Sequence, residues 1–241
     1  MSGVTFVLIP GAWMGAWSWH PVARHLRGQG HQVVALTMPG LSYGDSPAGL
    51  KMADAIDHVV QEIDRRDLRE IVLVSHSWGG YPATGAAHLR ADRIAKVIYY
   101  GAVVPAPGAG MADENPGYGE AIRASIRAIP DGTVPLPLEA IRAGLMPGES
   151  PELQELVAGL ALPQPGGYLT DALDVPAVTD IGGPAAYLLG ADDRSLARPG
   201  GEFAARLGLR PTAVPGGHMA LLSRPSEIAE AVIAAAVIAP A

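Results

Sequence analysis

Residues 73–82 read LVSHSWGGYP, an apolar run that ends in Ser75-His76-Ser77 and continues at once into two glycines. A buried strand that stops in this way and turns into a helix exposes its central serine, here Ser77, and holds it rigidly beside other groups. The flanking residues must be small because the two backbones almost touch at such a turn. The pattern therefore predicts a nucleophilic Ser77. The alternative interpretation is an ordinary strand end with a turn rich in serine and glycine.

The composition limits the classes of protein to consider. The chain has 241 residues, a net charge of −7 and no cysteine, so it can form one large α/β domain or two smaller ones without disulfides or thiolate metal sites. Its few cations are scattered, which argues against nucleic acid and anionic membranes as partners. No basic residues precede the first apolar run, and the apolar stretch 231–239 is shorter than the roughly 20 residues of a membrane span. We expect a soluble cytoplasmic protein without a signal peptide, with a small-molecule substrate. A homodimer is the one oligomeric assembly that we consider.

Short apolar runs alternate with longer amphipathic ones along most of the chain. The runs are nearly continuous in apolar residues, as in strands of a parallel sheet covered by helices on both faces. They predict a six-stranded, mostly parallel α/β fold with strands in 4–11, 31–40, 70–77, 95–104, 185–192 and 210–217. No glycine-rich phosphate-binding pattern follows any strand, so we expect no nucleotide cofactor. We likewise expect no other cofactor and no metal.

The alternation is interrupted once, between about residues 105 and 183. This segment is rich in proline and glycine and contains three short helical patterns, 120–129, 137–145 and 150–160. In the last of these, Ser150 suits the N-cap, Pro151 the first helical position, and Glu152 the positive helix end. A structureless loop of this length is rare in a compact domain. The chain is therefore divided into a core, 1–104 and 184–241, and an inserted helical cap, 105–183.

A serine nucleophile needs a histidine from another loop and a carboxylate behind that histidine. Of the seven histidines only His218 follows a late strand, in VPGGHMALLSRP. The strand AAYLLG runs into Asp192 and Asp193, and either could be the acid while the other caps a helix or forms a turn. His76 is adjacent to Ser77 but should face the other side of its strand, and a base adjacent in sequence is usually not the base in space. Five further histidines have helical or pre-strand contexts and are expected to lie on the surface or in packing: His20, His25, His31, His58 and His88.

An ester carbonyl that is attacked also needs two backbone amides directed at its oxygen. One is expected from Trp78, directly after the nucleophile, and the other from Ala12, in the loop IPGAWMGAW after the first strand. Apolar side chains near these motifs are candidates to line a substrate pocket, although they could equally pack helix on sheet. The residues assigned to substrate binding are Gly11, Trp13, Met14, Tyr81 and Met219.

At these positions the chain resembles the α/β-hydrolases, and more narrowly the short branch with plant methylesterases, hydroxynitrile lyases and bacterial pyrethroid-hydrolase-like esterases. The resemblance rests on the opening VLIPGAWMGAWSWHPVARHLRGQGHQVVAL, on SHSWGG, on LLGADDR and on GGHMALLSRP. It covers nearly the whole chain, with the inserted segment least similar and Pro10 where many members have histidine.

The resemblance implies further assignments. It favours Asp193 as the acid, with Asp192 as the alternative. The lyases of this branch have threonine at the position of Gly11 and lysine at that of Met219, so the chain matches the esterases. Ser77, in place of aspartate, is unlike the epoxide hydrolases and dehalogenases of the same fold.

Together these features predict a serine hydrolase that cleaves a carboxylic ester or lactone of a small, uncharged, hydrophobic substrate with Ser77, His218 and Asp193. A substrate charge would lack a partner near the motifs unless Arg123, Arg127 or Arg142 of the inserted segment reached the site. The same three residues could instead act on a thioester, an amide or a carbon–carbon bond. A ligand-binding pseudoenzyme of the same fold is the hypothesis from another functional class.

Overall fold

The computed structural model describes residues 3–237, so the ends of the predicted core, 1–2 and 238–241, lie outside the described residues. Its main sheet has six parallel strands in the order β2-β1-β3-β4-β7-β8, which confirms the predicted fold class. The strands are β1 (Thr5–Ile9), β2 (Gln32–Ala35), β3 (Ile71–His76), β4 (Ile94–Tyr100), β7 (Ala185–Gly190) and β8 (Thr212–Val214).

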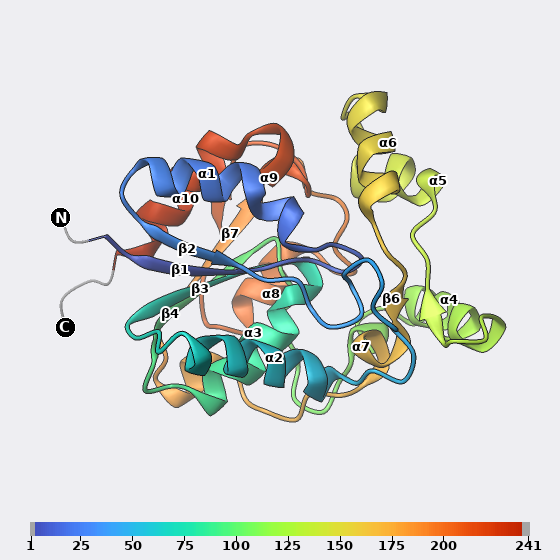
Figure 1. The fold of residues 1–241 in the computed structure, drawn as a ribbon, viewed down its shortest axis with the longest axis horizontal. Helices are drawn as coiled ribbons and strands as arrows, with labels where there is room; N and C mark the ends of the chain where they lie inside the picture. The colour runs from blue at the N-terminus through green and yellow to red at the C-terminus, as the bar shows by residue number, and fades with distance from the viewer. Residues whose placement is uncertain (1–2, 238–241) are drawn as a thin grey trace.

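Helices cover both faces of the sheet (Figure 1). They are α1 (His20–Gly28), α2 (Met52–Arg65), α3 (Gly80–Leu89), α8 (Gly200–Ala205), α9 (Ala220–Ser223) and α10 (Pro225–Ala236). Alternate residues of each strand face opposite layers, because side chains alternate along a strand. Val7 and Ile9 pack in one apolar cluster with α2, α3 and α8, whereas Phe6 and Leu8 pack in the other with α1 and α10. Both faces are therefore buried, which explains the continuous apolar runs.

The strands are shorter than the predicted runs. β4 ends at Tyr100 because Gly101 has φ +48°, a left-handed conformation that stops the strand. Of the last predicted run, 210–217, only β8 is strand, and its remainder forms the loop to His218. Within residues 3–237, none of the helices is long and apolar enough to cross a membrane.

The inserted segment, residues 105–183, contains more regular structure than its sequence indicates. Its helices are α4 (Pro116–Ala128), α5 (Leu138–Ala140), α6 (Pro151–Leu160) and α7 (Gly166–Thr170), with helical turns η3 (Met111–Asp113), η4 (Ile141–Leu145) and η5 (Val178–Ile181). The predicted cap of α6 is present, since Ser150 Oγ accepts the Leu153 amide at 3.3 Å. The antiparallel pair β5 (Thr133–Val134) and β6 (Gln164–Pro165) was not predicted, because strands of two residues leave no periodic signal.

The inserted segment lies at the end of the sheet that binds ligands in open α/β folds. In Figure 1, α4, α5 and α6 stand beyond the sheet on the side opposite the two termini. β1 runs from the N-terminus toward them, so they lie past the carboxyl ends of the parallel strands. This placement brings the segment next to the loops that carry the predicted site.

Candidate active site

Ser77 lies at the sharp turn that the sequence predicts, between β3 and the short helix η2 (Ser77–Gly79). Its φ is +53°, a strained conformation for a residue with a side chain and one that is typical of functional turns. It is the one residue of 71–87 that is not buried. The glycines are required by contact: a Cβ on Gly79 would lie 2.5 Å from the Pro10 carbonyl oxygen, and one on Gly80 would lie 1.8 Å from that of Val103.

His218 is paired with Asp193 and not with Asp192. The Nδ1 of His218 donates to Asp193 Oδ2 at 2.8 Å, and the side chains are only 2% and 1% exposed. Asp192 is exposed. Burial raises the pKa of Asp193, but the charge and hydrogen bond of His218, with the Ser195 amide, lower that pKa more, so the carboxyl is more acidic than usual. The proton on Nδ1 leaves the His218 Nε2 lone pair free to act as a base.

Ser77 and His218 are not hydrogen-bonded to each other among the described residues. Their proximity is instead indicated by His76, which adjoins Ser77 and whose ring centroid lies 4.5 Å from that of His218. Such a gap is common without substrate, because catalytic hydrogen bonds often tighten only in the complex.

His76 supports the histidine loop, which we define as residues 215–219. Its Nε2 donates to the His218 carbonyl oxygen at 3.0 Å, and its ring stacks on Tyr100 at 5.5 Å. The acceptor is a carbonyl, so the proton sits on Nε2, and the buried Nδ1 has no partner among the described residues. Burial, and then the charge of His218, hold the pKa of His76 well below its usual value, so the ring is neutral.

Two other supporting residues were missed from the sequence. A Cβ on Gly101 would lie 2.9 Å from Asp193 Oδ2, so only glycine lets the acid approach the end of β4. Its position directly after an apolar strand was the available signal. The Ser195 amide donates to Asp193 Oδ1 at 2.9 Å, as expected after an aspartate turn, while its hydroxyl donates to the Gly144 carbonyl in the inserted segment.

The loop after β1, residues 10–15, adjoins the nucleophile; we call it the β1 loop. A Cβ on Gly11 would lie 3.0 Å from both Ser77 Cβ and His76 Nδ1, so this backbone approaches the turn closely. Ala12 is buried in the loop, and Trp78 follows Ser77 with its indole donating to the Tyr168 carbonyl at 2.6 Å. The geometry places both predicted oxyanion residues on segments that flank Ser77.

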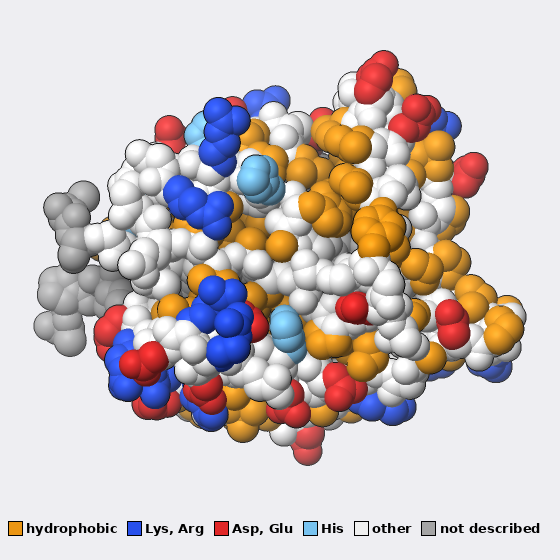
Figure 2. Space-filling model, in the orientation of Figure 1, with side chains coloured by type: hydrophobic (Ala, Val, Ile, Leu, Met, Phe, Trp, Pro, Cys, Tyr) orange, Lys and Arg blue, Asp and Glu red, His pale blue; other side chains and the backbone are white. Residues whose placement is uncertain are grey.

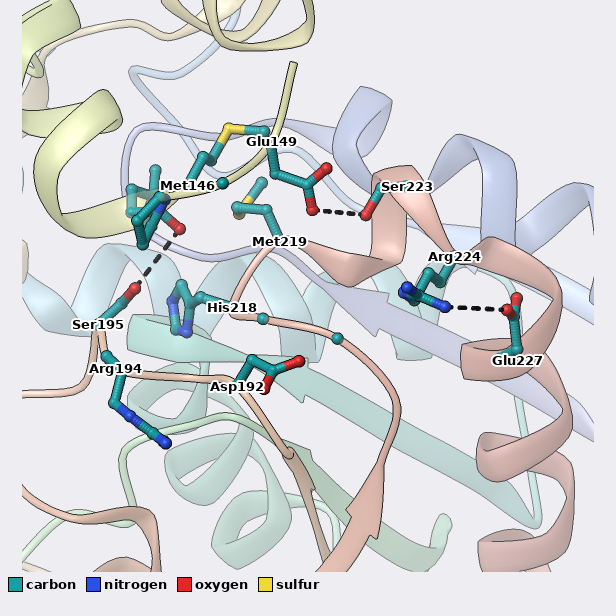
Figure 3. Close-up of a pocket in the computed structure, with 15 residues that line it drawn as sticks. Met146, Glu149, Asp192, Arg194, Ser195, His218, Met219, Ser223, Arg224 and Glu227 are labelled. Carbon is teal, nitrogen blue, oxygen red and sulfur yellow. Dashed lines mark hydrogen bonds and ion pairs between the residues drawn. The ribbon is translucent and has the colours of Figure 1, made fainter. Parts of the chain in front are cut away.

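Two cavities border the inserted segment. One, of about 550 Å³, lies between η4 and the histidine loop and is largely polar: Glu149 contacts Ser223, and Arg224 contacts Glu227 (Figure 3). The other, of about 530 Å³, is an apolar cleft between α1 and α6. Figure 2 shows hydrophobic side chains gathered on this face between the body and α6. Neither cavity is lined by Ser77 within residues 3–237.

The predicted substrate-binding residues are not gathered around one of these cavities. Met219 lines the polar cavity next to His218. Gly11 and Met14 are buried near the turn, and Trp13 is partly buried. Tyr81 is fully buried, and burial, followed by the Glu114 charge, raises its pKa. The assignment of these residues to substrate binding stays a prediction.

Within the described residues, five histidines make no hydrogen bond or ring contact with Ser77, His218 or Asp193, and one of them, His20, lines the apolar cleft. His20 and His25 are exposed, and His31, His58 and His88 are partly buried. Across the described ranges no group of three His, Asp or Glu side chains is arranged to hold a metal ion.

A family model described as the alpha/beta hydrolase family matches residues 6–231. The chain belongs to this family, and its sheet and helices have the fold of the family. Among curated proteins it is similar to a carbendazim-hydrolysing esterase of Nocardioides sp. (strain SG-4G), 35% identical over 105 residues, and to methylesterase 18 of Arabidopsis thaliana, 28% identical over 113 residues. These matches cover 43% and 45% of this chain and only 43% and 42% of the two relatives.

Solved structures match over nearly the full length. One is an extracellular alpha/beta-hydrolase from a Paenibacillus species, described as sharing structural and functional homology with tobacco salicylic acid binding protein 2. It has a TM-score of 0.90 and 26% identity, over 96% of this chain and 98% of that one. Polyneuridine aldehyde esterase has a TM-score of 0.77 over 97% and 99% of the two chains, but at 19% identity this likeness concerns the fold alone.

Proposed function

We propose that the protein is a serine esterase that hydrolyses carboxylic esters through Ser77, His218 and Asp193. The observation that carries the proposal is Ser77, partly exposed on a strained turn and adjacent to His76, whose ring lies 4.5 Å from that of His218, together with the bond from His218 Nδ1 to the buried Asp193. The names of its relatives, a carbendazim-hydrolysing esterase and methylesterases, support the same reaction class.

In the proposed mechanism, Ser77 Oγ attacks the ester carbonyl carbon while His218 Nε2 takes its proton. Asp193 stabilises the imidazolium that forms and keeps the proton of the neutral ring on Nδ1. The amides of Ala12 and Trp78 donate to the oxygen as it gains charge. His218 then protonates the departing alcohol, and a water molecule, activated by the same ring, releases the acid from Ser77.

The proposed substrates are small, uncharged and hydrophobic. The three arginines that could have neutralised a substrate anion already have partners: Arg123 pairs with Asp113, Arg127 with Glu120 and Arg142 with Glu155. A carboxylate near these three arginines would lose hydration without gaining a free cation, so the cations left for it to meet are Arg194 and Arg224, which line the polar cavity beside His218. An uncharged aryl or methyl ester loses less on entry and is therefore expected to be preferred.

The test compares kcat/KM for a neutral aryl ester with that for the same ester carrying a distal carboxylate, in the wild-type protein and in Ser77→Ala. We expect an initial burst of alcohol from the acyl-enzyme and a preference of at least about tenfold for the neutral ester. No turnover of any ester would contradict the esterase assignment. Equal turnover of the two esters would contradict the substrate class and leave the reaction class standing.

A further inference from the structure

The β1 loop has an unusual conformation at Trp13. The Met14 amide donates to the Gly11 carbonyl at 3.3 Å, so residues 11–14 form a β-turn, and the third residue of the turn, Trp13, has φ +65°. That position of such a turn favours glycine, because a side chain is strained there. A bulky residue keeps this conformation only when its surroundings hold it.

The inserted segment holds Trp13 at three points. The Trp13 amide donates to Gln164 Oε1 at 2.7 Å, and the indole Nε1 donates to the Val134 carbonyl at 2.7 Å. The Leu162 amide donates to the Trp13 carbonyl at 3.1 Å. Val134 and Gln164 face each other across β5 and β6, so this small sheet forms the surface on which the loop rests.

Among the described residues, the Gln164 side chain makes no hydrogen bond within the inserted segment itself. The side chain is fully buried, and its orientation is set because the Trp13 amide must meet the carbonyl oxygen. Its Nε2 is therefore the remaining group, and it has no hydrogen-bond partner among the described residues. A buried donor without a partner is unfavourable for stability, so the residue is better explained by the bond that it makes to the loop.

We propose that Gln164 is a positioning residue for the oxyanion hole. By accepting the Trp13 amide it fixes the turn that carries Ala12, so the Ala12 amide is correctly placed only while the inserted segment contacts the β1 loop. The inference rests on the proposed function, in which the adjacent Ala12 amide binds the oxyanion. The second expected donor residue, Trp78, is contacted by the same segment through the Tyr168 carbonyl at 2.6 Å and through ring stacking at 5.0 Å.

The test uses an aryl trifluoromethyl ketone, to which Ser77 Oγ adds. The new O–C bond converts the carbonyl into a tetrahedral oxyanion, and the serine proton passes to His218. The matching secondary alcohol has a similar size and the same aryl and trifluoromethyl groups but no carbonyl, so it reports binding alone. Since each variant is described by the ratio of the two inhibition constants, a partly unfolded preparation does not alter the result.

We expect Gln164→Met, which has similar length but no acceptor, to lower kcat and weaken ketone binding by about 10–100-fold, because one misplaced donor is costly in the transition state. KM and alcohol binding should change less than about threefold, since ground-state contacts remain. Gln164→Glu keeps an acceptor oxygen and, protonated in its buried site, should restore most of kcat.

Tyr43→Phe is the matched control. It removes another hydrogen bond between the core and the inserted segment, from the Tyr43 hydroxyl to the Gly159 carbonyl at 3.0 Å, without touching the β1 loop. It should leave the ketone-to-alcohol ratio unchanged. Equal weakening of ketone and alcohol by Gln164→Met, or a loss in Tyr43→Phe as large as in Gln164→Met, would overturn the inference while ester turnover by the wild type continued. A wild-type protein that neither hydrolyses esters nor binds the ketone would overturn the proposed function and this inference together.

Discussion

The histidine loop and the β1 loop both adjoin the turn of His76 and Ser77, yet they are held by different parts of the molecule. The histidine loop is fixed from within the core, by Asp193 at 2.8 Å on one side of His218 and by His76 at 3.0 Å on the other. The β1 loop leaves the core strand β1 and is bound at Trp13 by Val134, Leu162 and Gln164 of the inserted segment.

This difference separates two requirements of the proposed reaction. Proton transfer depends on residues of the hydrolase core that are bound to one another, although the inserted segment adjoins them through the bond from the Ser195 hydroxyl to the Gly144 carbonyl. Stabilisation of the oxyanion depends on a loop that the inserted segment holds. Changes in the inserted segment are therefore expected to affect the rate as well as the choice of substrate, because they act on the transition state directly.

We call His218, Asp193 and His76 the core half of the site and the β1 loop with Ala12 its other half. Ser77 belongs to both halves, so its loss should have the largest effect. Ser77→Ala removes the nucleophile at a partly exposed turn. The kcat for a neutral ester should fall by roughly 10⁶-fold, as it does when other triads lose their serine, while thermal stability stays close to wild type. Ser75→Ala is the control, because the Ser75 hydroxyl makes only a long 3.4 Å bond to the Ile98 carbonyl. An inactive Ser75→Ala variant beside an active Ser77→Ala variant would transfer the role of nucleophile to Ser75, two residues earlier.

Asp193 tests the core half alone. Asp193→Asn should lower kcat by on the order of 10⁴-fold, because an amide no longer favours the imidazole with its proton on Nδ1. Asp192→Asn removes an exposed carboxyl from the same turn and should change kcat by less than about threefold. Steady-state kinetics with one ester decides between them, and the reverse ranking would transfer the role to Asp192.

Gly101 tests how closely the core half must be packed. In Gly101→Ala the new methyl would lie 2.9 Å from Asp193 Oδ2 in a backbone with φ +48°, so the acid has to move. A displacement of this size should lower kcat by about 10–100-fold. Gly28→Ala, whose methyl meets nothing within 4 Å, should leave kcat unchanged. Equal activity of the two variants would mean that the acid tolerates movement and that the core half is less rigid than we infer.

The sequence predicted the core half of the site far better than the other half. Ser77 directly follows an apolar strand, and the Asp192–Asp193 pair and His218 lie in the loops after two later strands, where local patterns mark them. Gln164 could not be found in this way, because its partner Trp13 is 151 residues distant and a lone glutamine between two prolines carries no periodic signal. The bond from His76 to His218 was hidden for the same reason, since it joins residues 142 apart. The six strands of the main sheet followed from pattern, whereas their order and the contacts between the core and the inserted segment required the tertiary structure.

The buried, neutral state of His76 predicts how the stability of the core half depends on pH. Burial, with a further contribution from His218, lowers the pKa of His76 in the folded protein well below 6.5. In the unfolded chain His76 titrates near its usual value of about 6.5. Between these two values the unfolded chain binds a proton that the folded protein does not, so protonation favours unfolding. His58, whose pKa is lowered chiefly by burial, acts in the same direction.

The free energy of unfolding should therefore be fully retained above about pH 6.5 and should fall below it, by up to about 1.4 kcal/mol per pH unit for one such histidine. Urea unfolding between about pH 5 and pH 7.5 measures this slope. His76→Gln removes the titrating ring but can still donate an N–H to the His218 carbonyl. The pH dependence of its free energy of unfolding should therefore correspond to about one fewer proton taken up on unfolding, while His58 continues to contribute. His58→Gln provides the comparison at a partly buried site. If His76→Gln kept the wild-type slope, His76 would not be a neutral, buried support of the histidine loop. The inference that this loop is held from within the core would then be wrong.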